Sequence, residues 1–202
     1  MTSPPDASGW RAHLFLLGQF VRHPRHVGAI APSSRALAGA MVHGLEFSNG
    51  VRIVELGPGT GAFTSAILNQ LGPSARLLVV EVAEQFAVRL RAQWPGLECA
   101  CASAALLPAL LNERGIDHVD HILSGLPFAS LPALETTQIL DGVQLTLRSG
   151  GTFTTFQYVH AYGLRPAAMF RQELNERLGA EPSRTLIARN IPPAYVLRWT
   201  RG

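Results

Sequence analysis

The chain has 202 residues, of which 47% are hydrophobic and 15% charged, so a disordered chain is excluded and one domain with a sizeable core is expected. All 17 basic residues are arginine, and their excess over the 14 acids lies between residues 7 and 45, where four arginines meet no acid. A basic segment on a neutral body indicates an anionic partner, either a membrane surface or nucleic acid. The two cysteines, Cys99 and Cys101, have neither redox nor zinc spacing and read as small packing residues of a reducing compartment.

Targeting signals are not evident in the sequence. It contains no run of about 18 apolar residues and no secretory leader pattern. We therefore expect a cytoplasmic protein, attached peripherally to the inner face of the cell membrane if the basic segment meets lipid. The change in charge divides the chain into an N-terminal part, residues 1–45, and a main domain, residues 46–202.

The first predicted element is an amphipathic helix over Gly9–His23, which Pro24 ends. It has two interpretations. It is either a core helix packed on the domain or an interfacial helix whose aromatic side chains enter a bilayer while arginines bind lipid phosphates. In the second interpretation the membrane-binding residues are Trp10, Arg11, Phe15, Phe20, Arg22 and Arg25.

The rest of the chain alternates between short apolar runs and helical patterns, which predicts a parallel α/β sheet with helices on both faces. The predicted strands are 51–56, 76–81, 97–101, 119–123 and 152–158, with a closing pair at 184–190 and 195–200. The predicted helices are 35–43, capped by Ser33 or Ser34, then 63–71, 84–93, 104–112, 134–147 and 166–178, with a Gly150-Gly151 turn before the fifth strand. The last helix has an apolar stripe that suits either the core or a second membrane contact.

A glycine-rich turn follows the first strand directly. The chain reads Glu55-Leu-Gly57-Pro-Gly59-Thr60-Gly61 and then enters a helix. Such a turn lets a ligand approach the backbone, and the helix start presents free N–H groups to it. Glu81 ends the second strand, where a carboxylate suits a ribose diol.

This pattern resembles motif I of the class I methyltransferases, because an acid precedes the turn and the spacing is G-x-G-x-G. The alternative of dinucleotide binding usually shows G-x-G-x-x-G. The resemblance implies a Rossmann-like fold with an antiparallel strand near the C-terminus. It also implies S-adenosylmethionine as donor, S-adenosylhomocysteine as product and no metal. Motif I and the strand-end acid would bind the cofactor through Glu55, Gly57, Gly59, Thr60, Gly61 and Glu81.

A second resemblance covers nearly the whole chain from Trp10. The block from Phe20 to Ser34, with the Ser124–Phe128, Phe156–Tyr158 and Asn190–Ala194 segments, is similar to the bacterial phospholipid N-methyltransferases. This implies stepwise methylation of phosphatidylethanolamine towards phosphatidylcholine. It further implies that anionic membrane lipids and methylated phosphatidylethanolamines are partners, and that residues 28–34 lie over the cofactor. We expect a monomer and no nucleic-acid partner.

Two positions depart from the patterns of related enzymes. After the third strand such enzymes place Gly-Asp-Ala, whose Asp binds adenine, whereas this chain has Ala-Ser103-Ala. Ser103 either contacts adenine or only caps the next helix. Ser124 stands where adenine-N6 methyltransferases carry Asn or Asp, so methylation of RNA adenine loses its amine acceptor.

The methyl acceptor is expected between the Ser124–Phe128 loop and the end of the fifth strand, at the carboxyl edge of the sheet. Substrate contacts are assigned to Ser124, Gly125, Leu126, Phe128 and Tyr158, and Ser124 is also a cofactor candidate. Tyr158 and His160 are the catalytic candidates, either orienting or deprotonating the amine. The alternatives are an RNA adenine-N6 methyltransferase, a small-molecule methyltransferase and a non-catalytic lipid-binding module.

Overall fold

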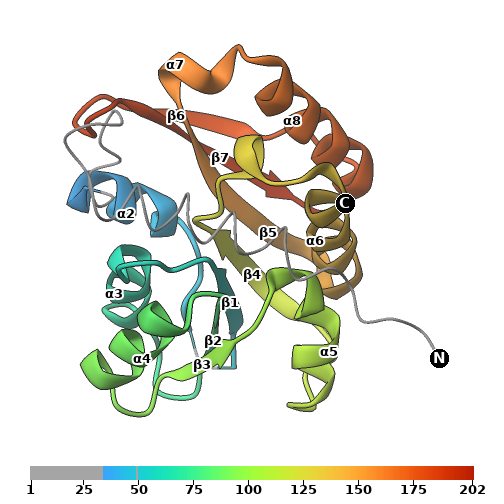
Figure 1. Ribbon diagram of the computed structural model, residues 1–202. Helices are drawn as coiled ribbons and strands as arrows, with labels where there is room; N and C mark the ends of the chain where they lie inside the picture. Colours follow the sequence, from blue (N-terminus) through green and yellow to red (C-terminus); the bar gives the residue numbers. More distant parts are fainter. Residues whose placement is uncertain (1–33, 49) are drawn as a thin grey trace. The chain divides into compact units, whose positions relative to one another are not determined.

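One seven-stranded mixed sheet organises the chain, in the order β3-β2-β1-β4-β5-β7-β6 (Figure 1). The computed structural model describes residues 34–48 and 50–202. The strands are β1 (Arg52–Leu56), β2 (Arg76–Glu81), β3 (Glu98–Cys101), β4 (Val119–Ser124), β5 (Leu147–Tyr158), β6 (Ser183–Ile187) and β7 (Ala194–Thr200). β1 to β5 pair in parallel, whereas β7 is antiparallel to both β5 and β6. The predicted fold is therefore confirmed.

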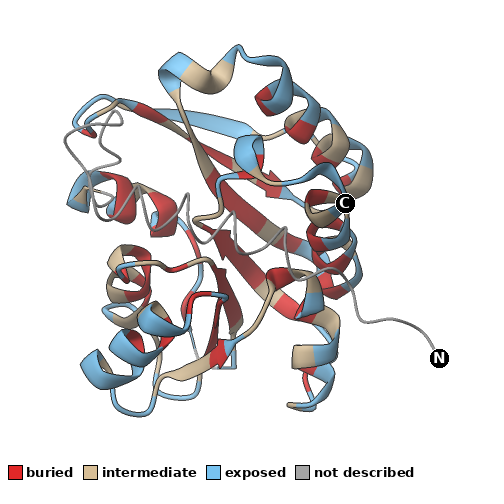
Figure 2. Ribbon diagram, in the orientation of Figure 1, coloured by how far each residue is buried: buried red, intermediate tan, exposed pale blue. Residues whose placement is uncertain are grey.

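Helices cover both faces of the sheet (Figure 1). They are α2 (Arg35–Val42), α3 (Ala62–Leu68), α4 (Glu84–Gln93), α5 (Leu107–Asn112), α6 (Ala133–Thr146), α7 (Val159–Tyr162) and α8 (Arg165–Leu178). α2, α3 and α4 share one apolar cluster, and α5, α6 and α8 share the other. Consecutive strand residues alternate between the clusters, as Ile53 and Val54 do, so the central strands are buried on both sides (Figure 2).

Three local expectations differ from the structure. Gly150 and Gly151 do not form a turn before the fifth strand, because β5 starts at Leu147 and the two glycines lie in a bulge where the pairing with β4 shifts. Glycine suits either feature, since both need unusual backbone angles, and Gly150 has φ +71°. The helix expected from residue 104 begins as a 3-10 turn over Ala104–Leu106, and α7 was not predicted.

The sheet places the ends of β1, β2, β4 and β5 along one edge, called here the carboxyl edge. Leu56 lies opposite Ser124, and Ser124 lies opposite Thr155. α2 belongs to this body, because Leu37 and Met41 are fully buried in the cluster that contains Phe63. The helix predicted at 9–23 lies outside the described residues. In the described part of the chain, no helix has both the length and the apolar character needed to cross a membrane.

Candidate donor and acceptor site

The glycine turn lies where it was predicted, between the end of β1 and the start of α3. Gly57, Gly59 and Gly61 all have positive φ, between +53° and +84°, which side chains rarely adopt. Gly61 is the N-cap of α3 and carries no side chain to cap it, so the first N–H groups of the helix face the turn. Thr60 is exposed in the same turn.

The three glycines have different surroundings. A Cβ at Gly57 would lie 2.5 Å from Cδ2 of Leu126, and one at Gly61 would lie 2.7 Å from the Trp94 ring. At Gly59, no described atom lies within 4 Å of the added carbon. Gly57 and Gly61 are therefore required by packing within the protein, and Gly59 alone borders open space where a ligand can approach.

Glu55 is completely buried at the end of β1. Thr64, on the first turns of α3, donates a hydrogen bond of 2.7 Å to Oε2 of Glu55. Oε1 has no hydrogen-bond partner among the described residues. Burial raises the pKa of this carboxyl to about 7, against a lowering by the Thr64 hydrogen bond. An unpaired carboxylate oxygen at this depth suits a cationic or donating ligand group.

Glu81 anchors the turn from the neighbouring strand. Its Oε2 accepts from the N–H of Gly59 at 3.1 Å, and its Oε1 accepts from the N–H of Ala83 at 2.9 Å. The carboxylate is 6% exposed, and burial raises its pKa. Each oxygen retains a lone pair for a ribose hydroxyl. Substitution by alanine would thus remove the anchor of the turn together with any ribose contact.

The loop after β4 touches the glycine turn. A Cβ at Gly125 would lie 2.6 Å from the carbonyl oxygen of Gly57, so only glycine allows this approach. The Oγ of Ser124 is buried and accepts from the N–H of Leu126 at 3.2 Å. Phe128, expected at the substrate, is 8% exposed and stacks on Phe170 with centroids 4.4 Å apart. Leu126 is half-buried and next to the turn, whereas the Phe128 ring belongs to the core.

Ser103 caps the 3-10 turn after β3. Its Oγ accepts from the N–H of Ala105 at 3.2 Å, which is the capping role that the sequence left open. The hydroxyl hydrogen is not used in that bond, so Ser103 can cap the turn and still donate a hydrogen bond to a ligand.

Tyr158 and His160 come together where β5 ends. Their rings stack with centroids 5.6 Å apart and an interplanar angle of 11°. Tyr158 also contacts Phe156 edge-on, and Phe156 in turn contacts Phe63 of α3. Burial raises the pKa of the half-buried Tyr158, so its phenol stays protonated at neutral pH. His160 is exposed.

A buried asparagine that the site prediction did not include connects α2 with the β6–β7 connection. Oδ1 of Asn190 accepts from the N–H of Ser34, and its Nδ2 donates to the carbonyl of Pro192. Ser34, rather than Ser33, is the N-cap of α2. The signal was available, because Asn190 begins the Asn-Ile-Pro-Pro-Ala segment. The candidate membrane residues Trp10, Arg11, Phe15, Phe20, Arg22 and Arg25 lie outside the described residues.

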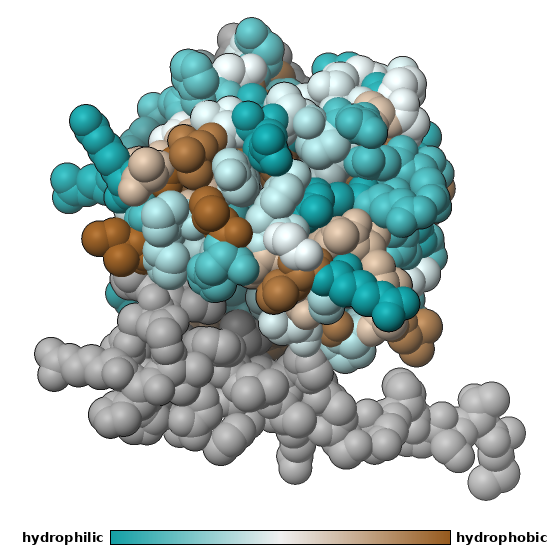
Figure 3. Space-filling model, turned by 90° about the horizontal axis from the view of Figure 1, so that it is seen from above, coloured by the Kyte–Doolittle hydropathy of each residue, from teal (hydrophilic) through white to brown (hydrophobic). Residues whose placement is uncertain are grey.

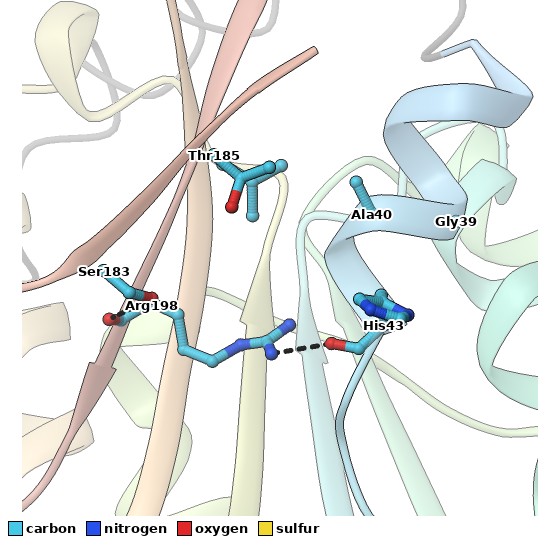
Figure 4. Close-up of a pocket in the computed structure, with 7 residues that line it drawn as sticks. Gly39, Ala40, His43, Ser183, Thr185 and Arg198 are labelled. Carbon is cyan, nitrogen blue, oxygen red and sulfur yellow. Dashed lines mark hydrogen bonds between the residues drawn. The ribbon is translucent and has the colours of Figure 1, made fainter.

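A cavity of about 290 Å³ lies elsewhere, between α2 and the β6–β7 pair (Figure 4). The residues that line it are Gly39, Ala40, His43, Ser183, Thr185, Val196 and Arg198. The Arg198 guanidinium is occupied, since it donates to the carbonyls of His43 and Met41 and to Oγ1 of Thr154. The glycine turn does not contribute to this cavity, so it is not the predicted donor site.

Comparisons with known proteins agree with this geometry. No family model matches the chain. An ornithine lipid N-methyltransferase of Singulisphaera acidiphila is 30% identical over 184 residues, which are 88% of this chain and 90% of that protein.

Solved structures show the same fold at low identity. The 1,6-didemethyltoxoflavin-N1-methyltransferase of Burkholderia thailandensis has a TM-score of 0.66 at 17% identity, covering 99% of this chain and 93% of its own. Fibrillarin of Aeropyrum pernix, solved with S-adenosylmethionine, has a TM-score of 0.60 at 16% identity and covers 80% and 73%. The chain therefore belongs to the class I S-adenosylmethionine-dependent methyltransferases, in the same family as this ornithine lipid N-methyltransferase.

Proposed function

We propose that this methyltransferase transfers methyl groups to the primary amine of a membrane lipid. The observation that carries the proposal is the 30% identity, over 88% of the chain, with a lipid N-methyltransferase. The acceptor we assign first is phosphatidylethanolamine with its methylated intermediates, towards phosphatidylcholine. This choice is supported by the resemblance of the Phe20–Ser34 block to phospholipid N-methyltransferases. The enzyme would then act at the inner face of the cell membrane.

The donor end of the site fits S-adenosylmethionine. The unpaired Oε1 of Glu55 offers a buried acceptor for the methionine end, as the motif I resemblance implies. The open space at Gly59 admits a ligand against the backbone, and Glu81 would accept from the ribose hydroxyls. Ser103 and Ser124 are candidates at the adenine. The bound cofactor supplies a sulfonium methyl group that needs no further activation.

The acceptor end must hold an amine in line with that methyl group and remove its proton. Tyr158 supports this role by position, at the end of β5 on the carboxyl edge, and its protonated phenol can orient the amine by hydrogen bonding. The exposed imidazole of His160 stacks on Tyr158 and can accept the proton. The tyrosine face would also attract the methylated ammonium of later steps. Leu126 and Gly125 form the wall towards the donor.

Ornithine lipid is a second acceptor, and the relative from Singulisphaera acidiphila favours it. Both headgroups carry a primary amine, so the donor chemistry and the roles of Tyr158 and His160 are the same for either. What differs is the group that neighbours the amine, which is a phosphate in phosphatidylethanolamine and a carboxylate in ornithine.

The test supplies the purified full chain with S-adenosylmethionine and each acceptor in turn. Vesicles of phosphatidylethanolamine, vesicles containing ornithine lipid and unmethylated ribosomal RNA are followed by mass spectrometry. We expect methylated lipid with one of the first two and none with RNA. Gly59→Val should abolish the product, whereas Glu84→Gln, at an exposed position on α4, should not. Methylation of RNA without lipid would contradict the proposal.

The remaining alternatives predict other outcomes. A small-molecule methyltransferase would act on soluble amines and ignore vesicles, and a non-catalytic module would bind the donor without transferring its methyl group. Lipid analysis after expression in cells that lack phosphatidylcholine would show how many methyl groups are added.

A further inference from the structure

Apolar side chains are exposed at the carboxyl edge around α7. Val159 is the first residue of this short helix and Leu164 follows it, Met169 lies on α8, Leu186 is in the edge strand β6, and Ile191 is in the β6–β7 connection. Their exposed fractions run from 39% for Val159 to 80% for Ile191. Figure 3 views the molecule from this end and shows apolar patches separated by hydrophilic ones.

Three contacts bring these elements together. The N–H of Val159 donates to the carbonyl of Pro193, so α7 begins against the β6–β7 connection. The rings of Tyr162 and Tyr195 lie 4.9 Å apart. Leu186 pairs with Tyr195 in the ladder between β6 and β7. These contacts therefore join four segments into one surface, called here the α7 rim. It consists of the start of α7, the residues up to the first turn of α8, the end of β6 and residues 188–193.

The charge of the α7 rim has one sign. No Asp or Glu occurs in residues 151–172 or 182–202. Arg165, Arg184 and Arg189 are exposed there, and none of them forms an ion pair with a described residue. The acids of α8 begin at Glu173, farther along the helix, where Glu173 pairs with Arg177. The Arg184 guanidinium lies over the rings of Tyr162 and Tyr195. Exposed apolar side chains thus lie among guanidinium groups that form no ion pair with a described residue.

We propose that the α7 rim docks on an anionic phospholipid bilayer. Interfacial binding depends on summed apolar area and on charge, so it accepts apolar residues scattered over several elements. A protein partner would instead require a contiguous, complementary patch. The rim begins at the residue after Tyr158, so docking would bring the acceptor side of the site to the lipid headgroups. This consequence rests on the proposed function, whereas docking itself does not.

Two double variants of the full chain test the rim. Leu164→Ser with Ile191→Ser removes apolar contacts, and serine at position 164 suits the N-cap of α8. Arg165→Glu with Arg189→Glu reverses the charge, and a carboxylate at position 165 would be compatible with the start of a helix. The matched controls are Leu145→Ser, at a leucine 71% exposed near the end of α6, and Arg89→Glu on α4.

Co-sedimentation uses vesicles of phosphatidylcholine with and without phosphatidylglycerol. We expect wild type to bind in proportion to the anionic lipid. Each rim variant should bind at least about tenfold more weakly, because each arginine and each inserted side chain strengthens adsorption severalfold. The controls should match wild type, and all variants should keep the unfolding midpoint of wild type.

Activity then separates this inference from the proposed function. Rim variants should lose methyl transfer on vesicles but keep it on lipid dispersed in detergent. If the rim variants bind anionic vesicles as wild type does, the docking surface is wrong, whatever lipid is methylated. If vesicle binding depends on the rim while no lipid is methylated in vesicles or in detergent, the rim is supported as the docking surface and the proposed methyl acceptor is wrong.

Discussion

A single substitution of the buried Glu55 tests its effect on the stability of the fold and on donor binding, which are measured by different methods. Its pKa is raised from 4.5 to about 7 in the folded protein, with burial as the main cause. Between these two values the folded state keeps a proton that the unfolded state has lost. The contribution of Glu55 to stability is therefore complete at low pH and is lost as the pH rises through about 7. Glu55→Gln removes this titration while preserving the size of the side chain.

The magnitude follows from the shift. For these two pKa values, linkage gives a loss of about 2.5 kcal/mol in the free energy of unfolding between about pH 5 and about pH 8. The variant should lack that loss. The new amide group would stand where Oε1 has no described partner, at a cost of about 1–3 kcal/mol that does not depend on pH. Either protein can thus be the more stable one at a given pH, but the free energy of unfolding should fall less steeply with pH in the variant than in wild type.

Urea unfolding at several pH values measures the profiles, and calorimetry measures donor affinity. We expect the profile of Glu55→Gln to be flatter than that of wild type by about 2.5 kcal/mol, and donor affinity to fall by about 1–3 kcal/mol. Glu84→Gln, at an exposed position of α4, serves as the control and should change neither. If wild type and Glu55→Gln have parallel pH profiles of stability, the pKa of Glu55 is not raised in the folded protein, and the argument from its burial is refuted.

Three further predictions concern the turn, the acceptor and the N-terminal segment. Gly59→Val should weaken donor binding at least about tenfold by calorimetry, because a valine is strained at φ +53° and its side chain enters the open space at the turn; unchanged affinity would contradict the donor site. Tyr158→Phe should lower turnover on lipid with donor affinity unchanged. If the variant turns over as fast as wild type, the Tyr158 hydroxyl has no catalytic role and only its ring can contribute. Removal of residues 1–23 should weaken binding to anionic vesicles with a salt-dependent difference of about 1 kcal/mol for each arginine lost; equal pelleting at every salt concentration would exclude that segment as a membrane contact.

The glycine turn of the candidate donor site could be predicted because its parts are close in sequence. A strand, a glycine turn and a helix follow one another from Glu55 to Gly61, and local patterns determine each of them. The role of Gly57 could not be read in this way. Its neighbour Leu126 is far away along the chain, and only the pairing of β1 with β4 brings the two together.

Amphipathic patterns do not distinguish a core helix from a membrane-binding helix, because an apolar stripe suits either environment equally well. In α8 the stripe of Ala167, Phe170 and Leu174 is buried, so that face is core. The exposed side chains that remain, such as Met169, do not follow the stripe, and no periodicity pointed to them. Phe128 illustrates the same limit, since its loop position suggested the substrate and tertiary packing placed it on Phe170.

The two ends of the site differ in how they are built. The donor end consists of the β1–α3 turn with Glu81 from the next strand, and the side-chain hydrogen bonds of Glu55 and Glu81 join residues at most 22 positions apart. The proposed acceptor end depends on long-range contacts. Val159 meets Pro193, and Asn190 meets Ser34 across 156 positions. Changes in the elements after β5 can therefore alter the acceptor side while leaving the local contacts of the turn intact. For this reason the fold and the class of donor follow from the comparisons, whereas the choice of headgroup depends on the elements that follow Tyr158.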